Sequence, residues 1–286
     1  MKKLSTEKYL SRVFTTIKKF KLVRNGDVVF IGLSGGKDSA SSLISLKRYV
    51  DEKSIDCEIK GFHINFGLPM SHKVEDIVRK QANMAGVELL VFKAGDNGIS
   101  LTDALRNTIR PICSVCGVVK RYLMNKVPRE NGASKVVTGH HMDDFLVFFF
   151  KNVLGKNFSW ISKFRPRLDS VHPKMLCKIR PLFMVGGEEN RSFCKSAGIP
   201  FIEEDICPHN YLSCTVDVGR EKWYEIIYDI EKKQKSFRYN MVNSIIKMAK
   251  FFEVDYRDEI RECSICGEPT SKDVCSFCRI FKVGKR

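Results

Sequence analysis

The stretch VVFIGLSGGKDSASSLISL, residues 28–46, decides the fold class of this chain. Residues 28–33 are apolar or small, which is typical of a strand buried on both faces, and residues 40–50 continue as a helix. The run Ser34–Ser39 joins the two. Its glycines let backbone N–H groups approach a phosphate closely, and the helix N-terminus adds partial positive charge. The stretch therefore predicts a strand, a phosphate-binding loop and a helix in succession.

The same alternation of strand and helix continues along the chain. Further strands are expected at residues 59–65, 88–93 and 135–139, and further helices at residues 72–85, 116–127, 142–154, 188–197 and 218–252. Such an order gives right-handed crossovers and a mostly parallel sheet covered on both faces. We therefore expect an α/β, doubly wound fold with a small C-terminal knuckle.

Changes in composition divide the chain into four expected parts. They are a basic N-terminal helix at residues 1–24, a catalytic α/β domain at residues 25–217, a helical extension at residues 218–259 and a cysteine-rich knuckle at residues 260–286. Within the catalytic domain, residues 156–180 are basic and irregular, which predicts a substrate-facing loop.

The net charge and the apolar runs of the chain indicate which kind of partner the protein binds. The 286 residues carry a formal net charge of +16, and eight of the first 24 residues are Lys or Arg. Such an excess attracts polyanions, which favours a nucleic acid over a small-molecule substrate. No apolar run approaches the roughly 20 residues that span a bilayer, and the N-terminus lacks the apolar stretch of a signal peptide. We expect a cytoplasmic protein that does not bind membranes.

Four of the eleven cysteines predict a metal site. Disulfides are rare in a reducing compartment, so clustered cysteines there indicate metal or redox chemistry. Two Cys-x-x-Cys pairs separated by eight residues are typical of a closed, tetrahedral zinc site, and a segment this short needs the metal in order to fold. The expected ligands of a structural Zn²⁺ are Cys263, Cys266, Cys275 and Cys278.

A third pair, Cys113 and Cys116, precedes the helix expected at residues 116–127 and lies after the third strand, hence near the edge that carries the phosphate-binding loop. Two thiolates at this spacing can hold a metal ion or a cluster. A cluster needs a third thiolate, for which Cys207 is the best candidate and Cys214 the alternative. The residues leave three interpretations open: an iron–sulfur cluster, a disulfide or persulfide relay, and a structural zinc.

Two motifs resemble those of a known superfamily. The run Ser34–Ser39 matches neither the loop of P-loop NTPases nor the dinucleotide-binding glycine motif, but it resembles the PP-loop of ATP pyrophosphatases. The segment TGHHMDD, residues 138–144, resembles the Gly-His-x-x-Asp-Asp segment of the tRNA-modifying branch. With the cysteines, the pattern resembles the tRNA 2-thiolation enzymes, or tRNA 2-sulfurtransferases. The knuckle is closer to their uridine-type group, which usually carries an N-terminal zinc finger, whereas this chain has no cysteine before Cys57.

The resemblance implies two half-reactions. The C2 carbonyl oxygen of a pyrimidine in tRNA attacks the α-phosphorus of ATP and pyrophosphate leaves. Sulfide, held at an open iron position of a [4Fe-4S] cluster, then displaces AMP to give 2-thiouridine or 2-thiocytidine. The expected partners are tRNA and a sulfur donor, either sulfide, a cysteine desulfurase or a thiocarboxylated carrier protein, and a homodimer is an allowed state.

The resemblance also assigns residues. ATP and Mg²⁺ are expected at Ser34, Gly35, Gly36, Lys37, Asp38 and Ser39, with His63, Gly139, His140, Asp144 and Arg180 around them. The expected catalytic residues are Lys37, Asp38, Asp143 and the proposed cluster ligands Cys113, Cys116 and Cys207. His63 lies near the end of the second expected strand, where relatives often have an acidic residue.

Two alternative functions are kept. One is a PP-loop ATP pyrophosphatase that acts on a small molecule or through a cysteine persulfide relay, although a small-molecule enzyme does not need a charge of +16. The other is a non-catalytic zinc-knuckle RNA-binding module, which would release no pyrophosphate and contain no iron after anaerobic purification.

Overall fold

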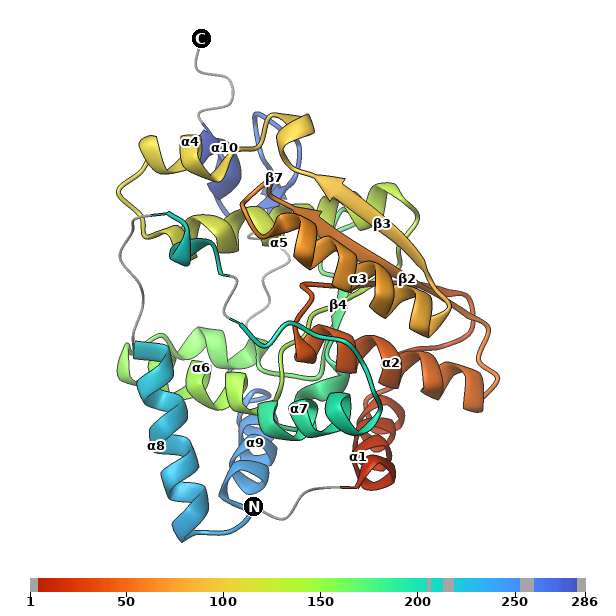
Figure 1. Ribbon diagram of the computed structural model, residues 1–286. Helices are drawn as coiled ribbons and strands as arrows, with labels where there is room; N and C mark the ends of the chain where they lie inside the picture. The colour runs from red at the N-terminus through yellow and green to blue at the C-terminus, as the bar shows by residue number, and fades with distance from the viewer. Residues whose placement is uncertain (1–4, 205–206, 213–218, 253–259, 282–286) are drawn as a thin grey trace.

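A six-stranded sheet organises the computed structural model, which describes residues 5–204, 207–212, 219–252 and 260–281. The strand order is β3-β2-β1-β4-β6-β5, and every pair is parallel except β5 with β6. The bounds of the strands are β1 Asp27–Gly32, β2 Cys57–Asn65, β3 Glu88–Lys93, β4 Lys135–Val137, β5 Arg167–Leu168 and β6 Cys177–Ile179. The mostly parallel, doubly wound sheet expected from the sequence is confirmed (Figure 1).

Helices cover both faces of this sheet, and the alternation of side chains along β1 shows how. Val29 and Ile31 pack into one core with helices α1, α2, α3 and α7, whereas Phe30 packs into a second core with α4 and α5. The bounds of these helices are α1 Thr6–Lys19, α2 Lys37–Glu52, α3 Ser71–Ala85, α4 Leu101–Arg106, α5 Ile112–Glu130 and α7 Gly187–Ser196. The basic N-terminal helix therefore shares its core with α2, the helix that follows the phosphate-binding loop.

A third apolar core lies beside the sheet, where α8 and α9 pack on α6 (Figure 1). The helical segment expected at residues 218–252 consists of two helices, with a turn between them at Ser236, whose φ is +67°. The elements of this layer are α6 Met142–Leu154, η2 Phe158–Lys163, η3 Pro181–Met184, α8 Gly219–Lys233 and α9 Phe237–Met248. The loop expected to be irregular at residues 156–180 contains η2, β5 and β6.

The cysteine-rich knuckle packs on α5, in the second core. It consists of the hairpin β7 (Arg261–Glu262) and β8 (Pro269–Thr270), followed by α10 (Ser276–Phe281). The ring of Phe277 stacks on Tyr122 of α5 with 3.9 Å between centroids, and Glu268 accepts two hydrogen bonds from Arg129 at 2.6 and 2.9 Å. The knuckle therefore supports the helix that begins with Cys113 and Cys116.

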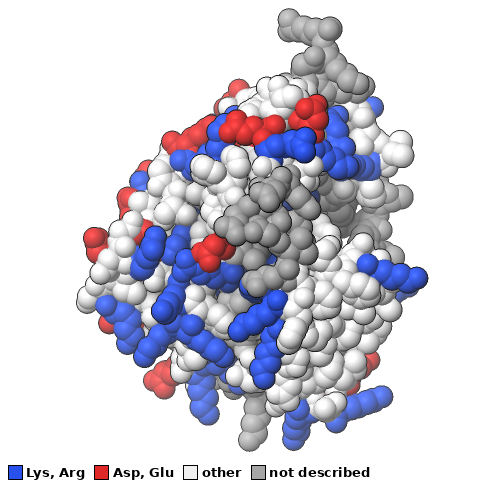
Figure 2. All heavy atoms as spheres, turned by 180° about the vertical axis from the view of Figure 1, so that it is seen from behind, with Lys and Arg blue, Asp and Glu red and all other residues white. Residues whose placement is uncertain are grey.

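Basic side chains gather on one face of the molecule, mainly on its lower half in Figure 2. Helix α1 buries its apolar face, including Tyr9 and Val13, and leaves its basic residues exposed. The exposed cations of α1 and of the turn after it are Lys8, Arg12, Lys18, Lys19, Lys21 and Arg24. Within the described ranges, none of the helices combines the length and apolar composition that crossing a membrane requires.

Candidate active site

The glycine-containing loop, residues 34–39, lies between the carboxyl end of β1 and the start of α2. Gly35 has a φ of +79°, and a Cβ there would lie 3.2 Å from the side chains of Ile202 and Val74. Gly36 is the N-cap of α2 and makes no side-chain capping bond. The first N–H groups of α2 thus lack a capping side chain, which is the arrangement that binds phosphate.

Two serines hold the shape of this loop. The Ser39 hydroxyl accepts a hydrogen bond from the Ser34 N–H at 3.2 Å and donates one to the Gly36 carbonyl at 3.0 Å. Lys37 extends from the loop and donates to the Asp38 carboxylate at 2.9 Å, and both side chains are partly exposed. Lys37 can therefore exchange this partner for a phosphate, which leaves the Asp38 carboxylate for a cation.

Two consecutive hydrogen bonds, which the sequence did not reveal, connect Asp38 to α7 and α1. The Asn190 side chain of α7 donates to the Asp38 carboxylate at 2.8 Å and accepts from the Tyr9 hydroxyl of α1 at 2.7 Å. Burial raises the pKa of Tyr9 well above its ordinary value, so the hydroxyl stays protonated and donates. The basic helix α1 is thereby connected to the phosphate-binding loop.

Replacing Tyr9 with Phe should weaken this connection. The Asn190 side chain loses its buried donor, which is expected to lower the free energy of unfolding by about 1–3 kcal/mol. Asp38 becomes less well oriented, so we expect a higher Mg²⁺ concentration at half-maximal pyrophosphate release. Tyr49→Phe is the matched control, because Tyr49 packs edge-on against Phe14 and its hydroxyl has no hydrogen-bond partner in the described part of the chain. Equal Mg²⁺ dependence of both variants would contradict the role of Tyr9.

The segment after β4 contacts the same loop. Gly139 lies so close to α2 that a Cβ would be 3.1 Å from the Ser39 backbone nitrogen, which explains the glycine. The His141 imidazole Nε2 lies 3.9 Å from the Asp38 carboxylate. The structure thus brings residues 138–141 beside the phosphate-binding loop, as the sequence motif implied.

The two carboxylates of this motif are turned toward α7, α8 and α9. Asp143 accepts from the Gly187 N–H at 2.9 Å, from the Tyr228 hydroxyl at 2.8 Å and from the Arg238 guanidinium at 2.8 Å. Its side chain is 1% exposed and that of Arg238 is 4% exposed. The buried pair joins the start of α6 to α9 across 95 residues.

Asp144 caps the start of α6. It accepts from the His141 N–H at 2.9 Å, from the Tyr224 hydroxyl at 2.6 Å and from the Arg220 guanidinium. Burial alone would raise its pKa, but the neighbouring His141 and Arg220 hold the pKa well below its usual range. One face of α8 carries a hydrogen-bonding side chain every four residues, namely Arg220, Tyr224 and Tyr228. This spacing was a signal in the sequence that was not used to predict their contacts with Asp143 and Asp144.

Two further expected ATP-binding residues have other contacts. The His63 Nδ1 lies 2.9 Å from the Leu33 carbonyl, and burial lowers the pKa of this imidazole, so it braces the end of β1 as a neutral group. Arg180 donates to the carbonyls of Lys163 and Arg165 at 2.8 and 2.6 Å and lies over the Phe145 ring. Burial lowers its pKa to about 10, and the guanidinium stays charged near pH 7.

The expected cluster ligands lie on α5 and next to it. Cys113 is exposed and Cys116 is buried, and both lie in the first turns of α5, which begins at Ile112 after Pro111 and not at residue 116 as expected. Proline before a helix costs no intrahelical hydrogen bond, which allows this earlier start. A helix N-terminus favours thiolates. Cys207 directly precedes η4 (Pro208–Asn210), which packs on α5, whereas Cys214 lies outside the described residues.

The four cysteines of the knuckle lie close enough to share one ion. The sulfurs of Cys263, Cys266, Cys275 and Cys278 lie within 4.8 Å of one another, which fits four ligands around one ion. Backbone N–H groups of Cys275 and Cys278 point at knuckle sulfurs at 3.2 and 3.4 Å, an arrangement that stabilises thiolates.

Fold and site together define a PP-loop protein, and a model of the PP-loop domain matches residues 7–211. Two tRNA-5-methyluridine(54) 2-sulfurtransferases are similar over most of their length: that of Pyrococcus horikoshii is 32% identical, covering 98% of this chain and 86% of the relative, and that of Thermotoga maritima is 33% identical, covering 95% and 86%. The chain belongs to this family of tRNA 2-sulfurtransferases within the PP-loop proteins, which confirms the resemblance seen in the sequence.

A solved structure has the same fold. It is the U34-tRNA thiolase NcsA from Methanococcus maripaludis with its [4Fe-4S] cluster, with a TM-score of 0.76 and 23% identity, covering 97% of this chain and 88% of that chain. At this identity the likeness establishes the fold alone. More distant relatives include the tRNA-cytidine(32) 2-sulfurtransferase of Geotalea daltonii, which is 24% identical over 86% of this chain.

Proposed function

We propose that this protein uses ATP to activate the C2 carbonyl of a pyrimidine in tRNA and then replaces that oxygen with sulfur. One observation carries the proposal. The Ile202 N–H donates to the Gly35 carbonyl of the phosphate-binding loop at 3.0 Å, and Cys207, five residues later, directly precedes η4 against α5. A backbone contact with the loop that fits a phosphate is therefore followed, five residues along the chain, by one of the cysteines that fit sulfur chemistry.

The first half-reaction is assigned to the loop. Its backbone N–H groups and Lys37 neutralise the charge of the ATP phosphates, and Asp38 holds Mg²⁺. Attack of the C2 oxygen on the α-phosphorus expels pyrophosphate. The C2 oxygen, otherwise a poor leaving group, can then leave as part of AMP. The tRNA base must leave its stack to reach this edge of the sheet.

The second half-reaction is assigned to Cys113, Cys116 and Cys207. Three thiolates, two of them at a helix N-terminus, fit a [4Fe-4S] cluster with three protein ligands. Such a group, when bound, supplies an iron position that is open to sulfur. The four knuckle cysteines fit a structural Zn²⁺, which would hold the knuckle against α5 and so keep Cys113 and Cys116 in place.

The names of the relatives favour uridine over cytidine as the target. The two uridine-modifying relatives are 32% and 33% identical to this chain, and the cytidine-modifying relative is 24% identical. The product we propose is therefore 2-thiouridine. Sulfide, a cysteine desulfurase or a thiocarboxylated carrier protein would supply the sulfur in the cytoplasm.

Anaerobic purification followed by an activity assay tests this function. We expect iron and acid-labile sulfide in the protein, and mass spectrometry of nucleosides should detect 2-thiouridine in tRNA treated with protein, ATP and sulfide. Omission of ATP should abolish the product, because the C2 oxygen is then not activated. Iron-free protein together with unmodified tRNA and no pyrophosphate release would contradict the proposal and favour an RNA-binding module.

A further inference from the structure

A cavity of about 540 Å³ is lined by residues of both α1 and α9, and we call it the α1–α9 cavity. Its volume is within the range of about 300–1,000 Å³ that ligand sites have. The described residues that line it include none of the phosphate-binding loop and none of the expected cluster ligands. The residues that carry the inference are Arg12, Thr15 and Lys19 of α1, Glu189 of α7, Glu231 of α8 and Tyr239 of α9.

Helix α1 presents a row of cations at this cavity. Every third or fourth residue along one face of the helix is polar and exposed, namely Lys8, Arg12, Thr15 and Lys19. The last three of these line the cavity. The three cations of the row form no ion pair with a carboxylate in the described part of the chain. They lie in the half of the molecule on which basic side chains gather (Figures 1 and 2).

Two acidic residues also line the α1–α9 cavity, but both face Arg238. The Glu189 carboxylate lies 3.1 Å from the Arg238 guanidinium and the Glu231 carboxylate lies 3.9 Å from it. Glu231 also accepts hydrogen bonds from two backbone N–H groups at 3.2 and 2.9 Å. The positive charges of Arg12 and Lys19 therefore remain available to a ligand, and they favour an anion.

Tyr239 adds an aromatic ring to the wall of the cavity. This residue is 47% exposed, and its ring stacks on no other aromatic ring among the described residues. Proteins bind single-stranded nucleic acid with this combination, because the phosphate meets the cations and the base stacks on the ring. A small anion would use the cations alone and would leave the ring without a contact. The pairing of charge and ring therefore favours a nucleotide.

We propose that the α1–α9 cavity binds an unpaired nucleotide of the RNA substrate, at a distance from the reacting base. Arg12 and Lys19 bind its phosphate, and Tyr239 stacks on its base. Lys8, one turn before Arg12 on the same face, binds a neighbouring phosphate. The inference rests on the proposed function, since it takes RNA as the substrate, and it adds a docking site for that RNA. The same helix supports the phosphate-binding loop through Tyr9, on its buried face.

Equilibrium binding of a fluorescently labelled tRNA transcript, measured without ATP at several salt concentrations, tests this site. We expect Tyr239→Ala to weaken binding about 5- to 150-fold, the range for loss of one base–aromatic stack. Tyr239→Phe keeps the ring and should bind like the wild type. The double variant Arg12→Met with Lys19→Met should lower the salt dependence by about two phosphate contacts. ATP affinity should not change, because these side chains do not line the phosphate-binding loop.

Lys53→Met is the matched control for charge. Lys53 is the exposed C-cap of α2, forms no ion pair with a carboxylate in the described ranges and does not line the cavity. Its substitution should leave the salt dependence of tRNA binding unchanged.

Three outcomes would contradict the inference or the function on which it rests. Normal affinity in Tyr239→Ala with normal salt dependence in the double variant would overturn the site, while tRNA binding by the wild type would leave the proposed function intact. A change in the double variant alone would indicate attraction of RNA to a charged face and would also overturn the nucleotide site. Wild-type protein that binds no tRNA would contradict the proposed function itself.

Discussion

Cys113→Ala is expected to abolish sulfur transfer while pyrophosphate release with ATP and tRNA continues. Cys113 is an exposed thiol in the first turn of α5 and has no hydrogen bond to the phosphate-binding loop in the described residues. Its loss removes one of three proposed ligands of the cluster. We expect thiolation to fall at least about a hundredfold, since even a partner in the shell behind a metal ligand can cost that much. Iron content should fall with it.

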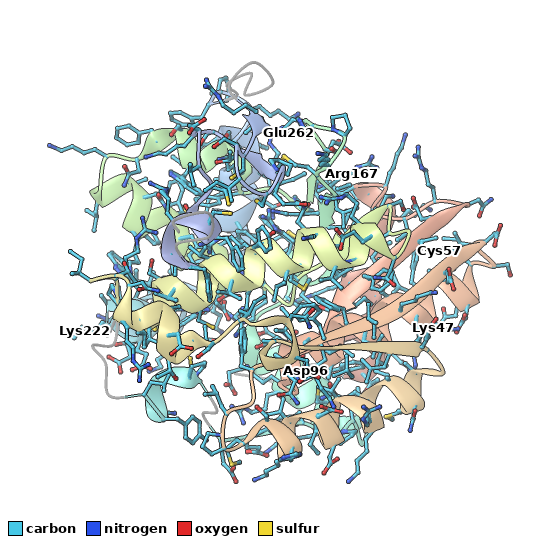
Figure 3. The ribbon with its side chains drawn as sticks, turned by 90° about the horizontal axis from the view of Figure 1, so that it is seen from above. Lys47, Cys57, Asp96, Arg167, Lys222 and Glu262 are labelled. Carbon is cyan, nitrogen blue, oxygen red and sulfur yellow. The ribbon has the colours of Figure 1, made fainter. Side chains whose placement is uncertain are left out.

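Cys57→Ala is the matched control for this variant. Cys57 lies at the amino end of β2, at the periphery of the molecule (Figure 3) and at the opposite edge of the sheet from the site. Burial raises the pKa of its thiol to about 11, so it stays protonated near pH 7 and is a poor ligand. A persulfide relay would show as iron-free active protein in which Cys113 gains one sulfur by mass spectrometry. Loss of both half-reactions in Cys113→Ala would show that α5 is structural.

Arg238→Met is expected to have the largest effect on stability. The guanidinium and the Asp143 carboxylate form a pair 2.8 Å apart that is almost fully buried. Removal of the cation leaves a buried charge without its partner, which costs about 3–5 kcal/mol. Glu189 and Glu231, at 3.1 and 3.9 Å from Arg238, would lose the same cation. Chemical denaturation of the holoprotein measures the change.

Two further variants test whether the loss of stability comes from the unpaired buried charge. The double variant Asp143→Asn with Arg238→Met should recover part of the lost stability, because it leaves no buried charge at position 143. Arg191→Met is the exposed control, since the ion pairs of Arg191 with Glu188 and Glu203 lie at the surface, and we expect a loss of about 0–1 kcal/mol. An Arg238→Met protein as stable as the control would contradict the buried pair. A stable but inactive double variant would support a catalytic role for Asp143.

The fold was predictable where its signals are local. The apolar run of β1, the glycines at 35 and 36 and the start of α2 follow one another within about a dozen residues, and the structure confirms their order. The metal site of the knuckle was equally predictable, because its four cysteines are close in the sequence and their sulfurs lie within 4.8 Å of one another. The division of residues 218–252 into two helices was not predictable in the same way. The turn between the helices places a serine, Ser236, at a positive φ, whereas such a position is usually occupied by glycine or asparagine.

The sequence by itself determined the strand, loop and helix that fit a phosphate, and the cysteines that fit metal or cluster chemistry. Each rests on residue types at short spacing, so local chemistry suffices. Only the tertiary structure decided that Tyr9 and Asn190 orient Asp38, and that Arg238 holds Asp143, across separations of 181, 152 and 95 residues. Tyrosines, asparagines and arginines are ordinary in a basic chain, and they acquire these roles only where packing buries them beside a partner.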